Sequence, residues 1–196
     1  DLTGTARDAT VLETARTRCD RSGTVFWITG LSGAGKTTVA MALSKKLREM
    51  RSAVVHFDGD QLRDIFQAAD THDPRSRREL AFMYARLCNA VSHQGVDTVC
   101  STISLFPEVH QWNRSNNHRY IEVYLRVPRE VLVMRDDKGL YEKSRKGEVN
   151  NVVGIDIPLV EPLEPDLTIE NDGRYEPDAV ADLILAQIGK RNPLQP

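Results

Sequence analysis

Residues 30–37 read Gly30-Leu31-Ser32-Gly33-Ala34-Gly35-Lys36-Thr37, which fits the phosphate-loop pattern G-x-x-x-x-G-K-[ST]. The glycines let the backbone curl until successive N–H groups point at phosphate oxygens. An apolar, β-branched and aromatic run at 24–29 precedes the loop, and apolar residues at helical spacing follow it over 36–50. A strand before the loop and a helix after it are the context in which this pattern binds phosphate. The stretch therefore predicts a nucleoside triphosphate site within an α/β fold.

Two residues at the end of this stretch suit a magnesium nucleotide. The Lys36 ammonium would neutralise the β- and γ-phosphates, and the Thr37 hydroxyl would ligate Mg²⁺. The helix that starts at Lys36 would add the positive end of its dipole. We therefore expect a triphosphate and Mg²⁺ to bind together at this loop.

The rest of the chain alternates between strand-like and helix-like patterns. Buried parallel strands are predicted at 24–29, 53–57, 96–101, 120–127 and 166–170, and helices at 36–50, 61–67, 75–93, 129–134 and 176–189. Alternation of this kind implies βαβ units, with a parallel sheet between two layers of helices. We expect a three-layer α/β fold of the P-loop NTPase type, with a five-stranded parallel sheet in the order 2-3-1-4-5.

Length and composition exclude several classes of protein. A chain of 196 residues is one domain, which we place at 23–192 after an N-terminal extension at 1–22. Lys plus Arg is 26 and Asp plus Glu is 28, and this near-neutral balance excludes a generally basic nucleic-acid binder. No apolar run approaches the roughly 20 residues that cross a bilayer.

The three cysteines are too few for a disulfide scaffold or a zinc cluster, and with no secretory signal we expect a cytoplasmic protein. Because the sequence begins without Met, a piece of a longer, multidomain polypeptide is one expectation.

Two carboxylates follow the second predicted strand. Asp58 and Asp60 flank Gly59 at the carboxyl end of that strand, the end at which open parallel sheets bind ligands. One carboxylate can orient Mg²⁺ and its waters, and the other can accept the proton of an acceptor hydroxyl. The competing interpretation is that Asp60 only caps the helix that follows it.

Arginines near the same edge suit an anionic acceptor. Arg63 is predicted on the first turn of the helix after Asp60, facing the same cleft, and Arg77 opens the next long helix. Guanidinium groups pair bidentately with phosphate or sulfate, although an ordinary surface charge is the alternative for both residues. Residues 135–147 carry five cations and two glycines. We expect 135–153 to be a mobile basic lid over the phosphates rather than core, with a solvated loop as the alternative.

These residues belong to a larger set that extends over 24–170. In this range the sequence resembles the adenylylsulfate (APS) kinases at 27–37, Asp58-Gly59-Asp60 with Arg63, Ile103-Ser104, Arg135-Asp136 with 138–141, and Gly154-Ile155-Asp156 with Pro158. The resemblance implies ATP- and Mg²⁺-dependent phosphorylation of the ribose 3′-hydroxyl of a 5′-activated nucleotide. It also implies that the protein is a homodimer. The expected ligands are small-molecule nucleotides, and neither a nucleic acid polymer nor a membrane is an expected partner.

The resemblance further implies roles for the matching residues. The catalytic residues would be Lys36, Asp60 and Ser104, and the metal ligands Thr37 and Asp58. ATP would contact Gly30, Leu31, Ser32, Gly33, Ala34, Gly35, Lys36, Thr37, Thr38 and Arg135. The nucleotide acceptor would contact Asp58, Asp60, Arg63, His72, Arg77, Ile103, Ser104, Lys138, Leu140, Val152, Gly154 and Ile155.

The sequence departs from the APS kinases around the acceptor. The family holds the acceptor adenine between two aromatic rings, and the aligned positions here are His72 and Val152. An asparagine three residues after the second arginine is replaced by Leu80, and a proline after the serine by Leu105. Losing the rings would forfeit stacking of about 1–3 kcal/mol per base. The stretch 100–108, with Trp112-Asn113-Arg114, is similar to the cytidine diphosphoramidate kinases, whose smaller pyrimidine would tolerate a less aromatic pocket.

Several functions therefore compete. A kinase for a nucleotide 3′-hydroxyl is the first, with adenosine 5′-phosphosulfate and cytidine 5′-diphosphoramidate as competing acceptors. A non-catalytic nucleotide-binding domain of a larger enzyme is the second, although it would be free to lose the lysine and the acids that this sequence keeps. A switch GTPase is the third, but no guanine-reading N-K-x-D follows a later strand. Asp136-Asp137-Lys138-Gly139 matches the GTPase pattern D-x-x-G at the wrong place in the strand order, so we interpret it as coincidence.

Overall fold

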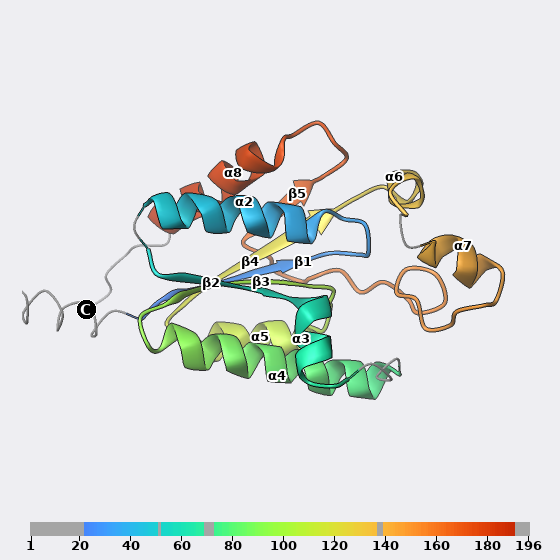
Figure 1. Ribbon diagram of the computed structural model, residues 1–196, viewed down its shortest axis with the longest axis horizontal. Coiled ribbons are helices and arrows are strands. Elements are labelled where there is room, and N and C mark those ends of the chain that lie inside the picture. The colour runs from blue at the N-terminus through green and yellow to red at the C-terminus, as the bar shows by residue number, and fades with distance from the viewer. Residues whose placement is uncertain (1–21, 51, 69–72, 137–138, 191–196) are drawn as a thin grey trace, which may run out of the picture.

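A parallel sheet of five strands forms the centre of this computed structural model, which describes residues 22–50, 52–68, 73–136 and 139–190 (Figure 1). The strands are β1 (Thr24–Thr29), β2 (Val54–Asp58), β3 (Asp97–Thr102), β4 (Arg119–Arg126) and β5 (Leu167–Glu170). Their order is β2-β3-β1-β4-β5, so the predicted order is confirmed. Of the predicted extension at 1–22, residues 1–21 lie outside the described residues.

Helices cover both faces of the sheet, as the alternating pattern predicts. Figure 1 shows α2 (Lys36–Glu49) and α8 (Pro177–Lys190) on one face, and α4 (Pro74–Ser92) and α5 (Pro107–Asn116) on the other. Three short helices lie at the end of the molecule where β1 runs into the phosphate loop: α3 (Gly59–Ile65), α6 (Arg129–Met134) and α7 (Leu140–Arg145). In the described part of the chain, we find no helix with the length and apolar character that a bilayer crossing requires.

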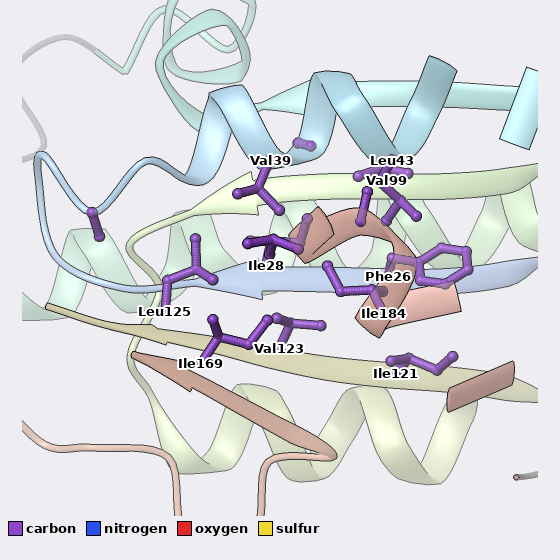
Figure 2. Close-up of a cluster of buried hydrophobic side chains, with 14 of the residues drawn as sticks. Phe26, Ile28, Val39, Leu43, Val99, Ile121, Val123, Leu125, Ile169 and Ile184 are labelled. Atoms are coloured by element: carbon purple, nitrogen blue, oxygen red, sulfur yellow. The ribbon is translucent and has the colours of Figure 1, made fainter. Parts of the chain in front are cut away.

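The central strand β1 separates two hydrophobic clusters. All six of its residues are buried, and its side chains alternate between the two faces of the sheet. Phe26 and Ile28 pack beneath α2 and α8 with residues such as Leu43 and Ile184, as Figure 2 shows. Val25 and Trp27 pack on the opposite face, against α4 and α5. A strand buried on both faces is a rigid support, so the loop that follows it starts from a fixed point.

The helix α5 was not predicted from the sequence. It begins at Pro107, a residue that suits the first turn of a helix because its missing N–H needs no partner there. Its buried residues are Val109, His110 and Asn113, so two of the three are polar. An apolar period of 3.6 residues is therefore absent from the sequence, although the helix has a buried face.

The expectation that 135–153 lies apart from the core is wrong at two of its described positions, and the expectation that the segment is a mobile lid stays a prediction. Tyr141, in the first turn of α7, is 6% exposed and belongs to the same hydrophobic cluster as Phe26 and Ile28. Val152 is also 6% exposed. The buried ring of Tyr141 anchors this charged helix to the core, and burying such a ring contributes on the order of 2–3 kcal/mol.

Two of the three cysteines lie in the described residues. Cys88 and Cys100 are buried free thiols, as the sequence predicts. Burial, with the neighbouring Cys88 next in importance, raises the pKa of the Cys100 thiol well above its usual value. These thiols are therefore packing residues, and Cys19 lies outside the described residues.

Candidate active site

The phosphate loop connects β1 to α2 and is tightly curled. Gly30, Gly33 and Gly35 have positive φ angles of 151°, 76° and 82°, which residues with a Cβ rarely adopt. A Cβ on Gly30 would also lie 2.6 Å from the carbonyl oxygen of Leu125, so only glycine fits there. The Lys36 Nζ donates to the carbonyl oxygen of Leu31 at 2.7 Å, which bends the side chain back over the loop. The predicted phosphate cradle and its lysine therefore lie together.

Residues far along the chain hold this loop in shape. The Asn171 amide, directly after β5, donates to the carbonyl oxygen of Ala34 at 2.8 Å, and the Tyr141 hydroxyl donates to that of Ser32 at 2.8 Å. Arg135 donates in turn to the carbonyl oxygen of Asn171 at 2.9 Å. Asn171 was not predicted as a site residue from the sequence, and Tyr141 was named only within the stretch 138–141 that carries the family resemblance, without a role at the loop. The only sequence signal for Asn171 is a polar residue at the carboxyl end of a strand.

Asp58 is the hub of the acidic turn. Its Oδ2 accepts hydrogen bonds from the Thr37 hydroxyl at 2.6 Å and the Ser101 hydroxyl at 3.0 Å, and its Oδ1 accepts one from the Asp60 amide at 2.9 Å. Burial alone would raise the pKa of Asp58, but the hydrogen bonds, led by that from Thr37, outweigh it and lower the pKa. Asp58 is therefore ionised at neutral pH.

The two acids have different structural positions. Asp58 is the N-cap of α3, so the competing interpretation, that Asp60 caps this helix, is wrong. Asp60 instead lies in the first turn, and its side chain is exposed. The Tyr84 hydroxyl, from α4, fixes the turn between them by donating to the carbonyl oxygen of Gly59 at 3.2 Å. The N-cap role therefore falls to Asp58 and not to Asp60.

The arrangement at Thr37 fits a magnesium ion. Thr37 gives its only hydroxyl proton to Asp58, so the lone pairs of its oxygen remain for a cation. Among the described residues, no three His, Cys, Asp or Glu side chains converge as a metal-binding group. A cation here would therefore be shared between Thr37, the Asp58 carboxylate and phosphate oxygens, which is how Mg²⁺ is usually bound beside nucleotides.

Ser104 lies next to the acidic turn, after β3. Its Oγ is 2.8 Å from the Thr102 Oγ1, and a Cβ on Gly59 would lie 3.2 Å from that same Thr102 oxygen. Ser104 is 8% exposed, whereas its neighbour Ile103 is 37% exposed. The structure thus brings the two predicted acceptor residues to the edge of the sheet where Asp58 and its turn lie.

The positive charges of Arg63 and Arg77 act on each other. Burial, and after it the charge of Arg63, lower the pKa of Arg77. The Nε of Arg77 is buried without a hydrogen-bond partner among the described residues. Like charges that act on each other in this way are relieved when an anion binds between them, so the pair suits an anionic ligand. Arg63 lies in the last turn of α3 rather than the first, because the helix begins at Gly59 and spans only seven residues.

The segment after α7 returns to both halves of the site. The Asp156 carboxylate accepts from the backbone amides of Asn151 and Val152, which closes a tight turn. Gly154, in this turn, lies against Leu31 of the phosphate loop, since a Cβ there would be 3.1 Å from the Leu31 Cδ1. The charge of Asp156 favours the charged form of Arg77 and so partly offsets the lowering of the Arg77 pKa by burial and Arg63. One loop therefore contacts the phosphate cradle and approaches the arginine pair.

The remaining predicted contacts occupy varied positions. Thr38 is exposed in the first turn of α2, Ile155 is half-buried and packs against the main cluster, and Leu140 begins α7. The Asp136 carboxylate accepts from the Leu140 amide at 2.8 Å, so its place in a D-x-x-G pattern reflects a helix cap. His72 and Lys138 lie outside the described residues.

Comparison with known proteins places this site in a family. A family model described as adenylylsulphate kinase matches residues 22–170. The chain belongs to the adenylylsulphate kinase family. The cytidine diphosphoramidate kinase of Campylobacter jejuni is 36% identical over 84% of this chain and 95% of that protein. The adenylyl-sulfate kinase of Clostridium acetobutylicum is 37% identical over 84% of this chain and 82% of that protein.

Solved structures agree with this assignment. The Mycobacterium tuberculosis APS kinase, in complex with AMPPNP and APS, superposes with a TM-score of 0.80 at 29% identity. The match covers 86% of this chain and 99% of that one. The chain is therefore a phosphotransferase that acts on a hydroxyl group, and the predicted family, fold and enzyme class are confirmed.

The grip of Asn171 on the phosphate loop can be tested directly. Asn171→Ala should weaken binding of AMPPNP about tenfold, because it leaves the buried Ala34 carbonyl without its donor at a cost of about 1–3 kcal/mol. Isothermal titration calorimetry measures the affinity. Asn116→Ala is the matched control, since its amide donates to the carbonyl of Trp112 at the exposed end of α5. Equal affinities for the two variants would show that Asn171 does not shape the loop.

Proposed function

We propose that this chain transfers the γ-phosphoryl group of ATP to the ribose 3′-hydroxyl of a cytidine nucleotide, with cytidine 5′-diphosphoramidate as the acceptor. In this reaction the 3′-oxygen forms a bond to the γ-phosphorus, the bond from that phosphorus to ADP breaks, and the hydroxyl proton is taken up by a base. Phosphoryl transfer of this kind depends mainly on positioning and charge neutralisation. The curled loop with Lys36 supports the donor half of the proposal.

The acidic turn supports a division of labour between its carboxylates. Asp58 is already held by hydrogen bonds, so its part is to orient Thr37 and the metal. Asp60 is exposed at the carboxyl end of β2 and is the carboxylate that can take the hydroxyl proton. Mg²⁺, when bound, would neutralise the phosphate oxygens that Lys36 also approaches. Ser104 is proposed as an acceptor contact, because direct transfer needs no phosphorylated serine.

The anionic group of the acceptor would bind between Arg63 and Arg77. The depressed pKa of Arg77 and its buried, unpartnered Nε support an anion at this position. A 5′-diphosphoramidate and a 5′-phosphosulfate are both anionic, so this feature alone does not choose between the two nucleotides. The choice depends on the pocket for the base.

Two buried apolar residues favour the cytidine nucleotide. Leu80 is 4% exposed and packs with Tyr84 in the cluster beneath α4, so it offers no polar atom to a base. Val152 is 6% exposed and supplies no ring for stacking. The APS kinases that the sequence resembles use an asparagine and an aromatic ring at these two positions. Adenosine 5′-phosphosulfate stays the second candidate, because the bound acceptor of the similar Mycobacterium tuberculosis enzyme is APS.

A competition between the two acceptors tests the proposal. With ATP and Mg²⁺, we expect kcat/KM for cytidine 5′-diphosphoramidate to exceed that for adenosine 5′-phosphosulfate at least about tenfold, the equivalent of one lost base stack. Chromatography of the 3′-phosphorylated products measures both rates. Preferential use of adenosine 5′-phosphosulfate would overturn the cytidine assignment. Tight ATP binding without turnover of either nucleotide would favour a non-catalytic domain. That the chain forms a homodimer and works in the cytoplasm stays a prediction.

A further inference from the structure

A line of hydrogen bonds leads from the edge of the sheet to the proposed metal site. The His56 Nε2 lies 3.0 Å from the Ser101 Oγ, and Ser101 lies 3.0 Å from the Asp58 Oδ2 that also accepts from Thr37. The sheet register explains the alignment. Asp58 pairs with Ser101 across β2 and β3, and His56 lies two residues before Asp58, so all three side chains share the face beneath α2.

Counting hydrogens fixes the direction of each bond. A carboxylate can only accept, so Ser101 donates its single hydroxyl proton to Asp58. The Ser101 oxygen then has only lone pairs to offer His56, and the imidazole must donate from Nε2. Thr37 likewise donates to the same carboxylate oxygen. The line therefore runs one way, from His56 through Ser101 to Asp58, and meets Thr37 at Oδ2.

These bonds leave the Asp58 carboxylate little freedom to rotate. Its Oδ1 is occupied by the Asp60 amide and its Oδ2 by two hydroxyls. We propose that His56 and Ser101 are positioning residues, which fix Asp58 and through it keep the Thr37 oxygen directed at the metal of the bound nucleotide. This inference rests on the donor half of the proposed function, the binding of ATP with Mg²⁺, and does not depend on which acceptor is used.

The locations of the two residues argue against a packing role for His56. Ser101 is 2% exposed, so a hydroxyl there needs a partner, and Asp58 supplies it. His56 is different, because it lies on the edge strand and lines a surface hollow with Lys45 and Arg48. An imidazole at that rim is not needed to fill the core. Its donation to Ser101 is then the contact that a substitution would remove.

Three variants separate positioning from folding. Ser101→Ala removes the donor to Asp58, His56→Leu removes the donor to Ser101, and His56→Gln keeps an N–H donor at similar reach. Ser92→Ala is the matched control, because Ser92 is also buried and its hydroxyl donates to the carbonyl of Asn89, within α4. Thermal unfolding of each variant reports whether the fold is kept. His56→Leu at the rim preserves the test if Ser101→Ala unfolds.

The readout is the Mg²⁺ dependence of AMPPNP binding, measured by calorimetry at a series of metal concentrations. Partners that orient a metal site from outside typically change metal affinity 10–100-fold. We expect Ser101→Ala and His56→Leu to raise the half-saturating Mg²⁺ concentration about tenfold, with metal-free nucleotide affinity changed less than about twofold. His56→Gln should restore the wild-type value.

Each outcome decides the inference. An unchanged Mg²⁺ requirement in Ser101→Ala, or in His56→Leu where Ser101→Ala unfolds, would overturn it. A His56→Gln variant as impaired as His56→Leu would remove His56 from the line and leave only Ser101. If wild-type protein bound AMPPNP with no dependence on Mg²⁺, the donor half of the proposed function would fail first. A shifted Mg²⁺ requirement without turnover of either acceptor would support the inference and count against the kinase reaction.

Discussion

Replacing Asp60 with asparagine should nearly abolish phosphoryl transfer and leave nucleotide binding intact. Asparagine has the same shape as aspartate but cannot take up the hydroxyl proton, and a positioned base typically contributes 10²–10⁴-fold to the rate. We therefore expect kcat to fall on the order of a thousandfold. The Asp60 side chain is exposed in the first turn of α3, so the substitution should not disturb the fold. Steady-state rates with ATP and each acceptor measure the loss, and calorimetry with AMPPNP measures binding.

Asp64→Asn is the control for that experiment. Asp64 is exposed on the same short helix, so it repeats the loss of one charge without touching the carboxyl end of β2. Its kcat should stay within about twofold of wild type, as is usual for surface substitutions. Near-normal turnover by Asp60→Asn would show that another group accepts the proton, and the role of Asp60 would have to be withdrawn.

The sheet was predictable because its central strands carry an unambiguous pattern. A short run as apolar and β-branched as 24–29 is typical of a strand buried on both faces, and the glycine-rich turn after it fixes where the strand ends. The predicted strands 96–101 and 120–127 differ from β3 and β4 by one residue at each end. Strand ends depend on which neighbouring backbone groups find partners, and that information is not local to the sequence.

The candidate site was predictable where a motif or the carboxyl end of a strand marks the residues concerned. Lys36 and Thr37 lie in the phosphate loop itself, where the sequence places them, and the structure shows which groups they contact. Asn171 supports that loop from the far end of the chain, and the sequence separation of the Asn171–Ala34 bond hides it from any local pattern. Ser101 meets Asp58 only because two strands pair in one register. Contacts of this kind follow from topology.

The contact between the charged segment 135–147 and the core was not predicted from the sequence, for a similar reason. Composition marks 135–147 as a solvated stretch, and most of its side chains are polar or charged. A single aromatic residue, Tyr141, nevertheless joins the core and donates to the Ser32 carbonyl at 2.8 Å. The average composition of thirteen residues hides the contribution of one aromatic side chain, whereas that side chain provides the contact with the core. Charge density therefore indicates where the surface of this segment lies but not whether the segment is separate.

Glu122 is an ionisable residue of β4 whose removal should cost the protein much of its stability. It is 2% exposed and lies 3.0 Å from the His110 Nδ1, 3.1 Å from the Arg114 Nη2 and 3.3 Å from the Tyr120 hydroxyl. Glu122→Gln keeps the shape of the side chain and removes its charge. Arg114 retains Asp166 at 3.4 Å, but the buried donors around Glu122 lose their charged acceptor. Hydrogen bonds to a charged group are worth about 1.5–3 kcal/mol, so we expect the free energy of unfolding to fall by about that amount.

Urea denaturation of Glu122→Gln and of Glu161→Gln tests whether burial is the reason for the large contribution of Glu122 to stability. Glu161 also pairs with an arginine, Arg126, but both side chains are more than two-fifths exposed, and such pairs are worth at most about 1 kcal/mol. If both variants lost the same unfolding free energy, the ion pair of Glu122 would contribute no more to stability than an exposed pair does. The effect should also reach the acceptor side, because the His110 Nε2 donates to the Ser104 carbonyl at 2.8 Å. A raised acceptor KM in Glu122→Gln, at temperatures where it stays folded, would link this buried cluster to the position of Ser104.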